Sequence, residues 1–334
     1  MSKLRIIAEA GVNHNGNINI AKSLIDHAKI AGANYIKFQS YKTENLVCKN
    51  APTTNYQKKN SRVNSQFQLL KKYELSQKSH KIIIQYCKKK RIKFLSSVFD
   101  LESLDLLTNL GIKKFKIPSG EINNYPLLEK ISLKANEIFL STGMSTVQEI
   151  KNAIKILIKN NCKLKKKITV MHCTSNYPSD YKDVNLLFLN YLKKFSNLNI
   201  GYSDHTIGCE TSIAAVALGA NVIEKHITLS RYKIGPDHAA SMNVKEFLNF
   251  VKSLRKTEVL LGNQKKVLNL EEIKNKKLVR KSIVARFLIK KGDLFSISNI
   301  TCKRPEGGIS PVFWNKVIGK VARKNFYIDQ FIKI

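Results

Sequence analysis

The stretch NIGYSDHTIGCETSIAAVALGANVIEKH, residues 199–226, decides the fold of this protein. It contains two short runs typical of β-strands, at 199–203 and 222–226, joined by an Ala-rich segment at 212–218 with helical spacing. Gly219 follows that segment, as is common where a helix ends. A strand, a helix and a second strand in this order form the repeating unit of a parallel α/β fold.

The same rhythm extends back to the start of the chain. Segments with helical periodicity, such as 20–31, 75–90 and 147–160, alternate with further β-rich runs. The six earlier runs lie at residues 4–9, 35–39, 93–97, 113–117, 138–142 and 169–172. Eight β/α units in about 260 residues predict an α/β fold of the TIM (β/α)8 barrel type. A doubly wound sheet is the alternative, but it rarely has eight units of such even length.

The composition changes near residue 265. We expect a catalytic barrel over residues 1–265, a charged linker over 266–279 and a small β-rich domain over 280–334. Short strands are expected in this tail at residues 281–285, 300–303 and 317–321. A domain of about 55 residues buries little surface by itself. We therefore expect it to dock on a barrel, either its own or that of a partner chain.

The charge of the 334-residue chain is +34, which raises nucleic acid as a partner. Only nine of the 58 basic residues are arginine, however, and the lysines are spread along the chain rather than gathered in one arm. We therefore expect no nucleic-acid partner, although a positive field would steer small anionic substrates. No apolar run reaches the roughly 18 residues of a membrane span, and MSKLRIIAEAG lacks a signal-peptide pattern. The six cysteines form no CxxC pair, so a cytoplasmic protein with reduced thiols is expected.

Polar side chains recur at the carboxyl end of nearly every expected strand, where TIM barrels carry their active sites. These residues include Glu9, Lys37, Gln39, Ser97, Lys116, Ser119, Glu121, Ser141, Ser175, Tyr177, Ser203, His205, Glu224 and His226. Residues in phase at one end of all eight strands predict an active site there.

Two lysines and two histidines indicate the chemistry of that site. Lys37 and Lys116 lie in apolar strands, where a buried ammonium needs an anionic partner. A carboxylate and a phosphate on the substrate would supply it, and structural ion pairs with Glu9 or Glu121 are the alternative. His205 and His226 end neighbouring strands, so they can share one divalent ion, or they can be structural.

Nine segments of the chain carry a resemblance to a known family. They are AEAGVNHNG (8–16), IKFQS (36–40), KIPSGEINNYP (116–126), LSTGMST (140–146), HCTSNYPS (172–179), GYSDHTIG (201–208), IEKHIT (223–228), GPDHAASM (235–242) and KSIVARFLIKKGDLFSISNITCKRP (281–305). The chain resembles the sialic acid synthases, which condense phosphoenolpyruvate with an N-acetylated mannose-type sugar. The last segment resembles their antifreeze-like (SAF, β-clip) domain. The resemblance implies a domain-swapped homodimer in which the partner's small domain caps the barrel mouth.

The resemblance also implies roles for individual residues. The phosphoenolpyruvate-binding positions are Lys37, Ser97, Lys116, Ser119, Ser141, Ser203 and Ser175, the last of which is Asn in some relatives. The sugar-binding positions are Gln39, Glu121, Tyr177, Asp237 and Arg304. The ligands of a divalent metal, usually Mn²⁺ with Mg²⁺ or Co²⁺ as alternatives, are His205 and His226. The expected catalytic residues are Glu9, for proton transfer, and Lys37, Lys116 and His205.

The identity of the sugar stays open at this point. The motifs do not separate two candidate sugars. The first reading is N-acetylmannosamine, giving an N-acetylneuraminate synthase. The alternative is 2,4-diacetamido-2,4,6-trideoxymannose, giving N,N'-diacetyllegionaminate. Glu306 adds a carboxylate where relatives continue Arg-Pro-Gly, which puts the sugar rather than the reaction in question. A metal-dependent sugar isomerase, or an inactive barrel that binds carbohydrate or nucleic acid through its basic surface, are the more remote alternatives.

Overall fold

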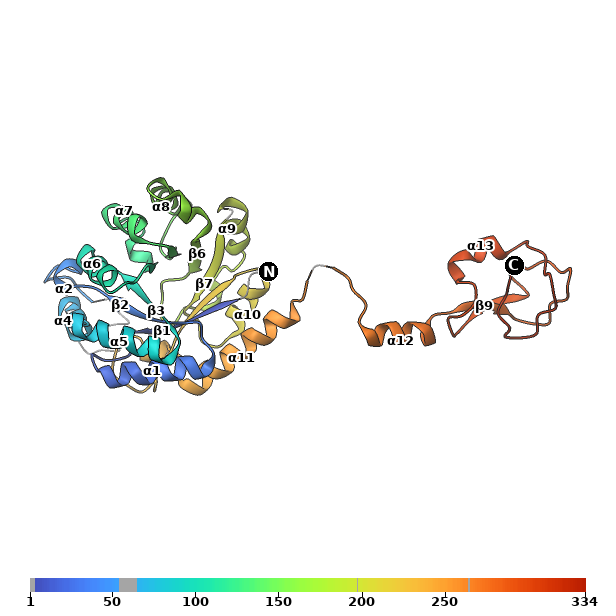
Figure 1. The fold of residues 1–334 in the computed structure, drawn as a ribbon, viewed down its shortest axis with the longest axis horizontal. Coiled ribbons are helices and arrows are strands. Elements are labelled where there is room, and N and C mark those ends of the chain that lie inside the picture. The colour runs from blue at the N-terminus through green and yellow to red at the C-terminus, as the bar shows by residue number, and fades with distance from the viewer. Residues whose placement is uncertain (1–3, 54–64, 197, 264) are drawn as a thin grey trace. The chain divides into compact units, whose positions relative to one another are not determined.

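The chain divides into two compact units, Met1–Gly262 and Asn263–Ile334, which are described separately. The computed structural model describes residues 4–53, 65–196, 198–263 and 265–334 (Figure 1). In this part of the chain no helix is both long and apolar enough to cross a membrane.

The first unit is a closed barrel of eight parallel strands in sequence order, with β1 hydrogen-bonded to both β2 and β8. The strands are β1 (Arg5–Gly11), β2 (Tyr35–Ser40), β3 (Lys93–Val98), β4 (Lys114–Ile117), β5 (Glu137–Ser141), β6 (Ile168–Cys173), β7 (Asn199–Asp204) and β8 (Val222–His226). Each overlaps one of the eight runs expected from the sequence, so the predicted TIM barrel is confirmed.

Helices surround the strands and connect them (Figure 1). They are α1 (Ile18–Ala31), α2 (Thr43–Leu46), α4 (Gln66–Tyr73), α5 (Gln77–Lys90), α6 (Leu101–Asn109), α7 (Tyr125–Lys134), α8 (Val147–Lys159), α9 (Phe188–Ser196), α10 (Glu210–Ala217) and α11 (Val244–Leu260). The first of them shows why they form. The Asn17 side chain accepts hydrogen bonds at its start, Gly32 ends it in the left-handed region, and the buried residues at helical spacing face the strands.

The core has two layers because both faces of each strand are buried. The outer layer lies between strands and helices. The inner layer fills the amino end of the barrel with six large side chains, Ile7, Tyr35, Leu95, Phe139, Met171 and Val222. Glu137 pairs with Arg5 and Lys114 at the start of these strands. The polar residues at the opposite, carboxyl end therefore rest on a packed apolar floor.

The second unit has its own small core. The helices and strands of this unit are α12 (Leu270–Val279), antiparallel strands β9 (Ser282–Ala285) and β10 (Ile300–Lys303), and α13 (Trp314–Val317). The strand expected at 317–321 is wrong, because Val317 ends a helical turn and Val321 makes only an isolated bridge to Leu294. The helical turn buries Val317 against the core, which hydrophobic content alone does not distinguish from a strand.

Candidate active site

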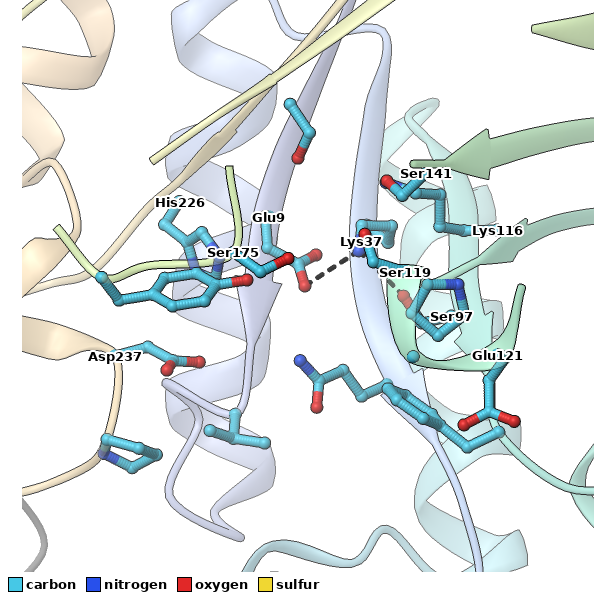
Figure 2. Close-up of a pocket in the computed structure, with 18 of the residues that line it drawn as sticks. Glu9, Lys37, Ser97, Lys116, Ser119, Glu121, Ser141, Ser175, His226 and Asp237 are labelled. Atoms are coloured by element: carbon cyan, nitrogen blue, oxygen red, sulfur yellow. Dashed lines mark hydrogen bonds and ion pairs between the residues drawn. The ribbon is translucent and has the colours of Figure 1, made fainter. Parts of the chain in front are cut away.

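The residues predicted for the active site line one cavity of about 400 Å³ at the carboxyl end of the barrel (Figure 2). From the predicted set the cavity contains Glu9, Lys37, Gln39, Ser97, Lys116, Ser119, Glu121, Ser141, Ser175, Tyr177, Ser203, His205, His226 and Asp237. They come together because alternate residues of a strand face the barrel interior and all eight strands end on the same side.

Two lysines and two glutamates form the buried charged centre of the cavity. Nζ of Lys37 lies 3.0 Å from Oε1 of Glu9 and 3.5 Å from Oε1 of Glu224. Nζ of Lys116 donates to Oε1 and Oε2 of Glu224 at 2.8 and 2.9 Å. In Figure 2 a dashed line joins Glu9 to Lys37, marking this ion pair. All four side chains are almost completely buried, so each charge depends on the others.

The two carboxyl groups titrate in opposite directions. Burial raises the pKa of Glu9 to about 7, and the nearby Glu224 charge adds to this effect while Lys37 opposes it. Burial also acts on Glu224, but Lys116 and Lys37 together outweigh it and hold the pKa of Glu224 well below its usual range. Glu224 is therefore the permanent counter-charge of the lysines. Glu9 can hold or release a proton near neutral pH.

Serine hydroxyls surround this charged centre. Nζ of Lys37 donates to Oγ of Ser97 at 2.9 Å, and Ser203 donates to Oε1 of Glu224 at 2.9 Å. The Gly143 amide donates to Oγ of Ser119 at 2.9 Å. Ser141 and Ser175 line the same cavity. Two ammonium groups and a ring of hydroxyls make a site for a small, multiply charged anion.

His205 and His226 lie side by side, with ring centroids 5.7 Å apart. The Tyr177 ring lies 4.2 Å from that of His205, tilted by 36°, and meets the His226 ring edge-on. Burial lowers the pKa of His205 to about 4 and lowers the pKa of His226 well below its usual value, so both rings are neutral.

The hydrogen bonds of these rings test whether they fit a metal. Nδ1 of His205 donates to the Thr174 carbonyl at 2.7 Å, which leaves Nε2 with a lone pair. Nδ1 of His226 is buried without a hydrogen-bond partner. Among residues 4–53, 65–196, 198–263 and 265–334, no group of three or more His, Cys, Asp or Glu side chains has the arrangement of a metal site. The pair therefore fits a divalent cation as two nitrogen donors, with other ligands from water or substrate.

Two of the predicted sugar residues, Gln39 and Asp237, lie next to Gly11, which has a φ of +50°. A Cβ atom at this position would lie 3.4 Å from Oδ2 of Asp237, 3.4 Å from Oε1 of Glu9 and 3.6 Å from Nε2 of Gln39. Burial raises the pKa of Asp237 to about 6. Three polar groups of the cavity lining thus converge beside the Gly11 backbone.

One side of the cavity is apolar, a feature that the sequence analysis missed. We call it the apolar wall, and it consists of Val12, Leu46, Val47, Leu69, Leu70 and Tyr73. Most of it belongs to the α2 and α4 region, which interrupts the regular β/α rhythm. Glu74 joins the two helices, because it accepts from the amide and hydroxyl of Thr43 at 3.1 and 2.8 Å. No short motif marks such a surface, so only the folded chain reveals it.

Two further residues need separate mention. From the sequence, Glu224 has no assigned role beyond being one of the polar residues at the strand ends, whereas in the structure it pairs with both buried lysines. Arg304 belongs to the second unit, where it is exposed. Its predicted contact with the sugar stays a prediction.

Known proteins share both the fold and the motifs of this chain. The NeuB family profile matches residues 24–266, and the SAF domain profile matches residues 280–334. The N,N'-diacetyllegionaminic acid synthase of Campylobacter jejuni is 48% identical over 334 residues, which is 100% of both chains. The enzyme of the same name from Legionella pneumophila is 42% identical, covering 94% of this chain and 89% of its own. The crystal structure of N-acetylneuraminic acid synthetase from Leptospira borgpetersenii aligns with a TM-score of 0.71 and 33% identity, over 82% of this chain and 90% of its own.

Proposed function

The chain belongs to the NeuB family of nonulosonic acid synthases, and from this premise we propose its substrates. It condenses phosphoenolpyruvate with 2,4-diacetamido-2,4,6-trideoxymannose, forms N,N'-diacetyllegionaminate and releases phosphate. The observation that carries the proposal is the juxtaposition of the buried lysine pair with the apolar wall in one cavity.

The lysine pair supports phosphoenolpyruvate as the anionic substrate. Lys37 and Lys116 are 4% and 2% exposed, so an anion that reaches them is largely shielded from water and interacts strongly. Glu9 and Glu224 neutralise the lysines before the substrate arrives. A proton on Glu9 then leaves the centre with a net positive charge, which favours a bound carboxylate and phosphate.

The apolar wall supports the diacetamido sugar. That sugar has a methyl group at C6 and two acetamido methyl groups, whereas N-acetylmannosamine has a C6 hydroxyl and one such methyl. Leu69 and Tyr73 are 1% and 2% exposed. Apart from the tyrosine phenol, neither side chain has a polar group for a C6 hydroxyl. The motifs alone do not separate the two sugars. The wall, together with full-length similarity to legionaminic acid synthases, favours the 6-deoxy sugar.

The chain's own residues would act in the following order. Lys37, Lys116 and the serines hold phosphoenolpyruvate so that its C3 faces the aldehyde carbon of the open-chain sugar. C3 forms the new C–C bond, C2 gains positive character, and water adds to C2. The resulting tetrahedral intermediate expels phosphate by cleavage of the C2–O bond. Glu9 transfers a proton at the new hydroxyl or the attacking water, and the lysines offset the charge of the departing phosphate.

Family membership implies a divalent metal, and we propose that His205 and His226 hold it. Bound there, a cation such as Mn²⁺ would act as a Lewis acid toward the aldehyde oxygen. The cytoplasmic location, the domain-swapped homodimer and the sugar contact of Arg304 belong to the same proposal.

The test is phosphate release from phosphoenolpyruvate with Mn²⁺ and each of the two sugars. Faster release with the diacetamido sugar supports the proposal. Faster release with N-acetylmannosamine makes the protein an N-acetylneuraminate synthase and contradicts the role of the apolar wall. Release with neither sugar, in folded protein, overturns both and favours an inactive barrel, for which salt-dependent nucleic-acid binding is the next measurement.

A further inference from the structure

A second buried ion pair lies directly behind the two histidines. Asp204 and Lys225 are register partners at the ends of β7 and β8, with Oδ2 and Nζ 3.0 Å apart. Because side chains alternate along a strand, Ser203 and His205 face the cavity while Asp204 faces the surrounding helices. Asp204 and Lys225 are each 1% exposed and do not line the cavity, so they take no part in binding substrate directly.

The Asp204 carboxylate accepts hydrogen bonds from both sides of the β7–α10 turn. Oδ1 accepts from the amide and hydroxyl of Thr206 at 2.9 and 2.8 Å. Oδ2 accepts from the hydroxyls of Thr211 and Ser212 at 3.0 and 2.6 Å. His205 lies between Asp204 and Thr206, so the backbone on either side of its ring is held by this one carboxylate.

Lys225 connects the same turn to β8. Its ammonium donates to the Thr206 carbonyl at 2.5 Å and pairs with Asp204. His226 is the next residue along β8. The two strands also approach closely at Gly201, where a Cβ atom would lie 2.9 Å from the Val222 carbonyl oxygen. The backbone of each histidine is therefore fixed to the other through one buried network.

We propose that Asp204 and Lys225 are positioning residues that set the separation of His205 and His226 and thereby the affinity for a divalent cation. The inference rests on the proposed metal role of the two histidines. Groups that hydrogen-bond to metal ligands typically change metal affinity by about 10–100-fold when lost. Asp204 and Lys225 act through the backbone that carries the two rings, so we expect the lower end of this range. A simple anchor for α10 would instead affect stability without a specific effect on the cation.

The test is direct binding of Mn²⁺ to the full-length protein, with free Mn²⁺ measured by electron paramagnetic resonance. Lys225→Met removes the ammonium and keeps most of the side-chain volume. We expect its Kd for Mn²⁺ to rise about tenfold. Glu137→Gln is the matched control, because it breaks a partly buried ion pair at the opposite end of the barrel. Its Kd for Mn²⁺ should equal that of the wild type.

The remaining outcomes each decide the matter. A wild-type Kd in folded Lys225→Met, or an equal loss of affinity in Glu137→Gln, overturns the proposal. If Lys225→Met fails to fold, the double variant Asp204→Asn with Lys225→Met replaces it, because it leaves no buried charge unpaired. Its Kd for Mn²⁺ should also rise about tenfold. The variant His205→Ala with His226→Ala separates the two ideas. If it still binds Mn²⁺ as tightly as the wild type, the metal role of the histidines is wrong, whatever Lys225 does.

Discussion

Lys116 and Glu224, 108 residues apart in the chain, form a two-point ion pair in the barrel, with Nζ–O distances of 2.8 and 2.9 Å. Glu224 also lies 3.5 Å from Nζ of Lys37. One carboxylate therefore serves both lysines that we assign to phosphoenolpyruvate. Glu224 thus supplies negative charge to the lysines when no substrate is bound. This explains how two buried ammonium groups are tolerated in the unliganded protein.

Glu224→Gln should destabilise the free protein more than the liganded one. Removing one partner of a buried ion pair leaves charge uncompensated, so we expect the free energy of unfolding to fall by about 3–5 kcal/mol. Phosphoenolpyruvate should restore part of the loss by supplying negative charge. Thermal melting with and without phosphoenolpyruvate measures both effects. A ligand-induced rise in Tm no larger than in the wild type would contradict this assignment of Glu224.

Glu9→Gln should separate binding from turnover. The amide keeps the shape of the side chain but cannot exchange a proton, so we expect kcat to fall by about 10²–10⁴-fold. Binding of phosphoenolpyruvate should persist, because Lys37 and Lys116 remain. Calorimetric titration and phosphate release measure the two quantities. Wild-type turnover would remove Glu9 from the chemistry.

Removal of the metal should stop the reaction without unfolding the barrel. Treatment with a chelator should abolish phosphate release, and added Mn²⁺ should restore it, whereas the far-ultraviolet circular dichroism stays unchanged. The variant His205→Ala with His226→Ala should not respond to Mn²⁺ after the same treatment. An unchanged metal response in that variant would place the cation elsewhere.

Val12→Thr tests the apolar wall with a side chain of nearly the same shape. A hydroxyl placed among Leu69 and Tyr73 should weaken contact with a methyl-bearing sugar. We expect the ratio of kcat/KM for the diacetamido sugar to that for N-acetylmannosamine to fall by about tenfold, the effect typical of one methyl-sized contact. Val12→Ala is the control, because it loses the methyl contacts without adding a hydroxyl, and its ratio should fall less than that of Val12→Thr. An unchanged ratio in Val12→Thr would show that the sugar does not touch the wall.

The Glu137 ion pairs predict a pH dependence of stability. Burial alone would raise the pKa of Glu137, but the hydrogen bond from Lys114 and the charge of Arg5 outweigh burial and lower it from its ordinary value of 4.5. A pKa that is lower in the folded state stabilises the protein above the unfolded-state value, and this stabilisation is lost as the pH falls through the folded-state pKa.

Urea unfolding of wild type and Glu137→Gln checks this expectation. The difference in unfolding free energy between them should be largest above the unfolded-state pKa of Glu137 and should shrink as the pH falls through its lower folded-state pKa. A difference that does not change over this range would show that the ion pairs contribute nothing beyond packing.

The barrel and the location of its site follow from patterns in the amino-acid sequence. The β/α rhythm predicts eight strands, and every predicted run overlaps a strand of the structure. Alternation along each strand then directs residues such as Lys37, Ser97 and His226 to one cavity, because parallel strands end on one side. These periodicities are local, so they can be read from the sequence without knowledge of tertiary contacts.

Which charged side chains form ion pairs, and which residues surround them, depends on the tertiary structure. Glu224 pairs with Lys116, and Asp204 with Lys225, because closure of the barrel brings these atoms within hydrogen-bond distance. The apolar wall arises where α2 and α4 fold over the barrel mouth, and no periodicity marks it. The interaction between two charges depends on their separation and burial, and both quantities exist only once distant parts of the chain have packed together.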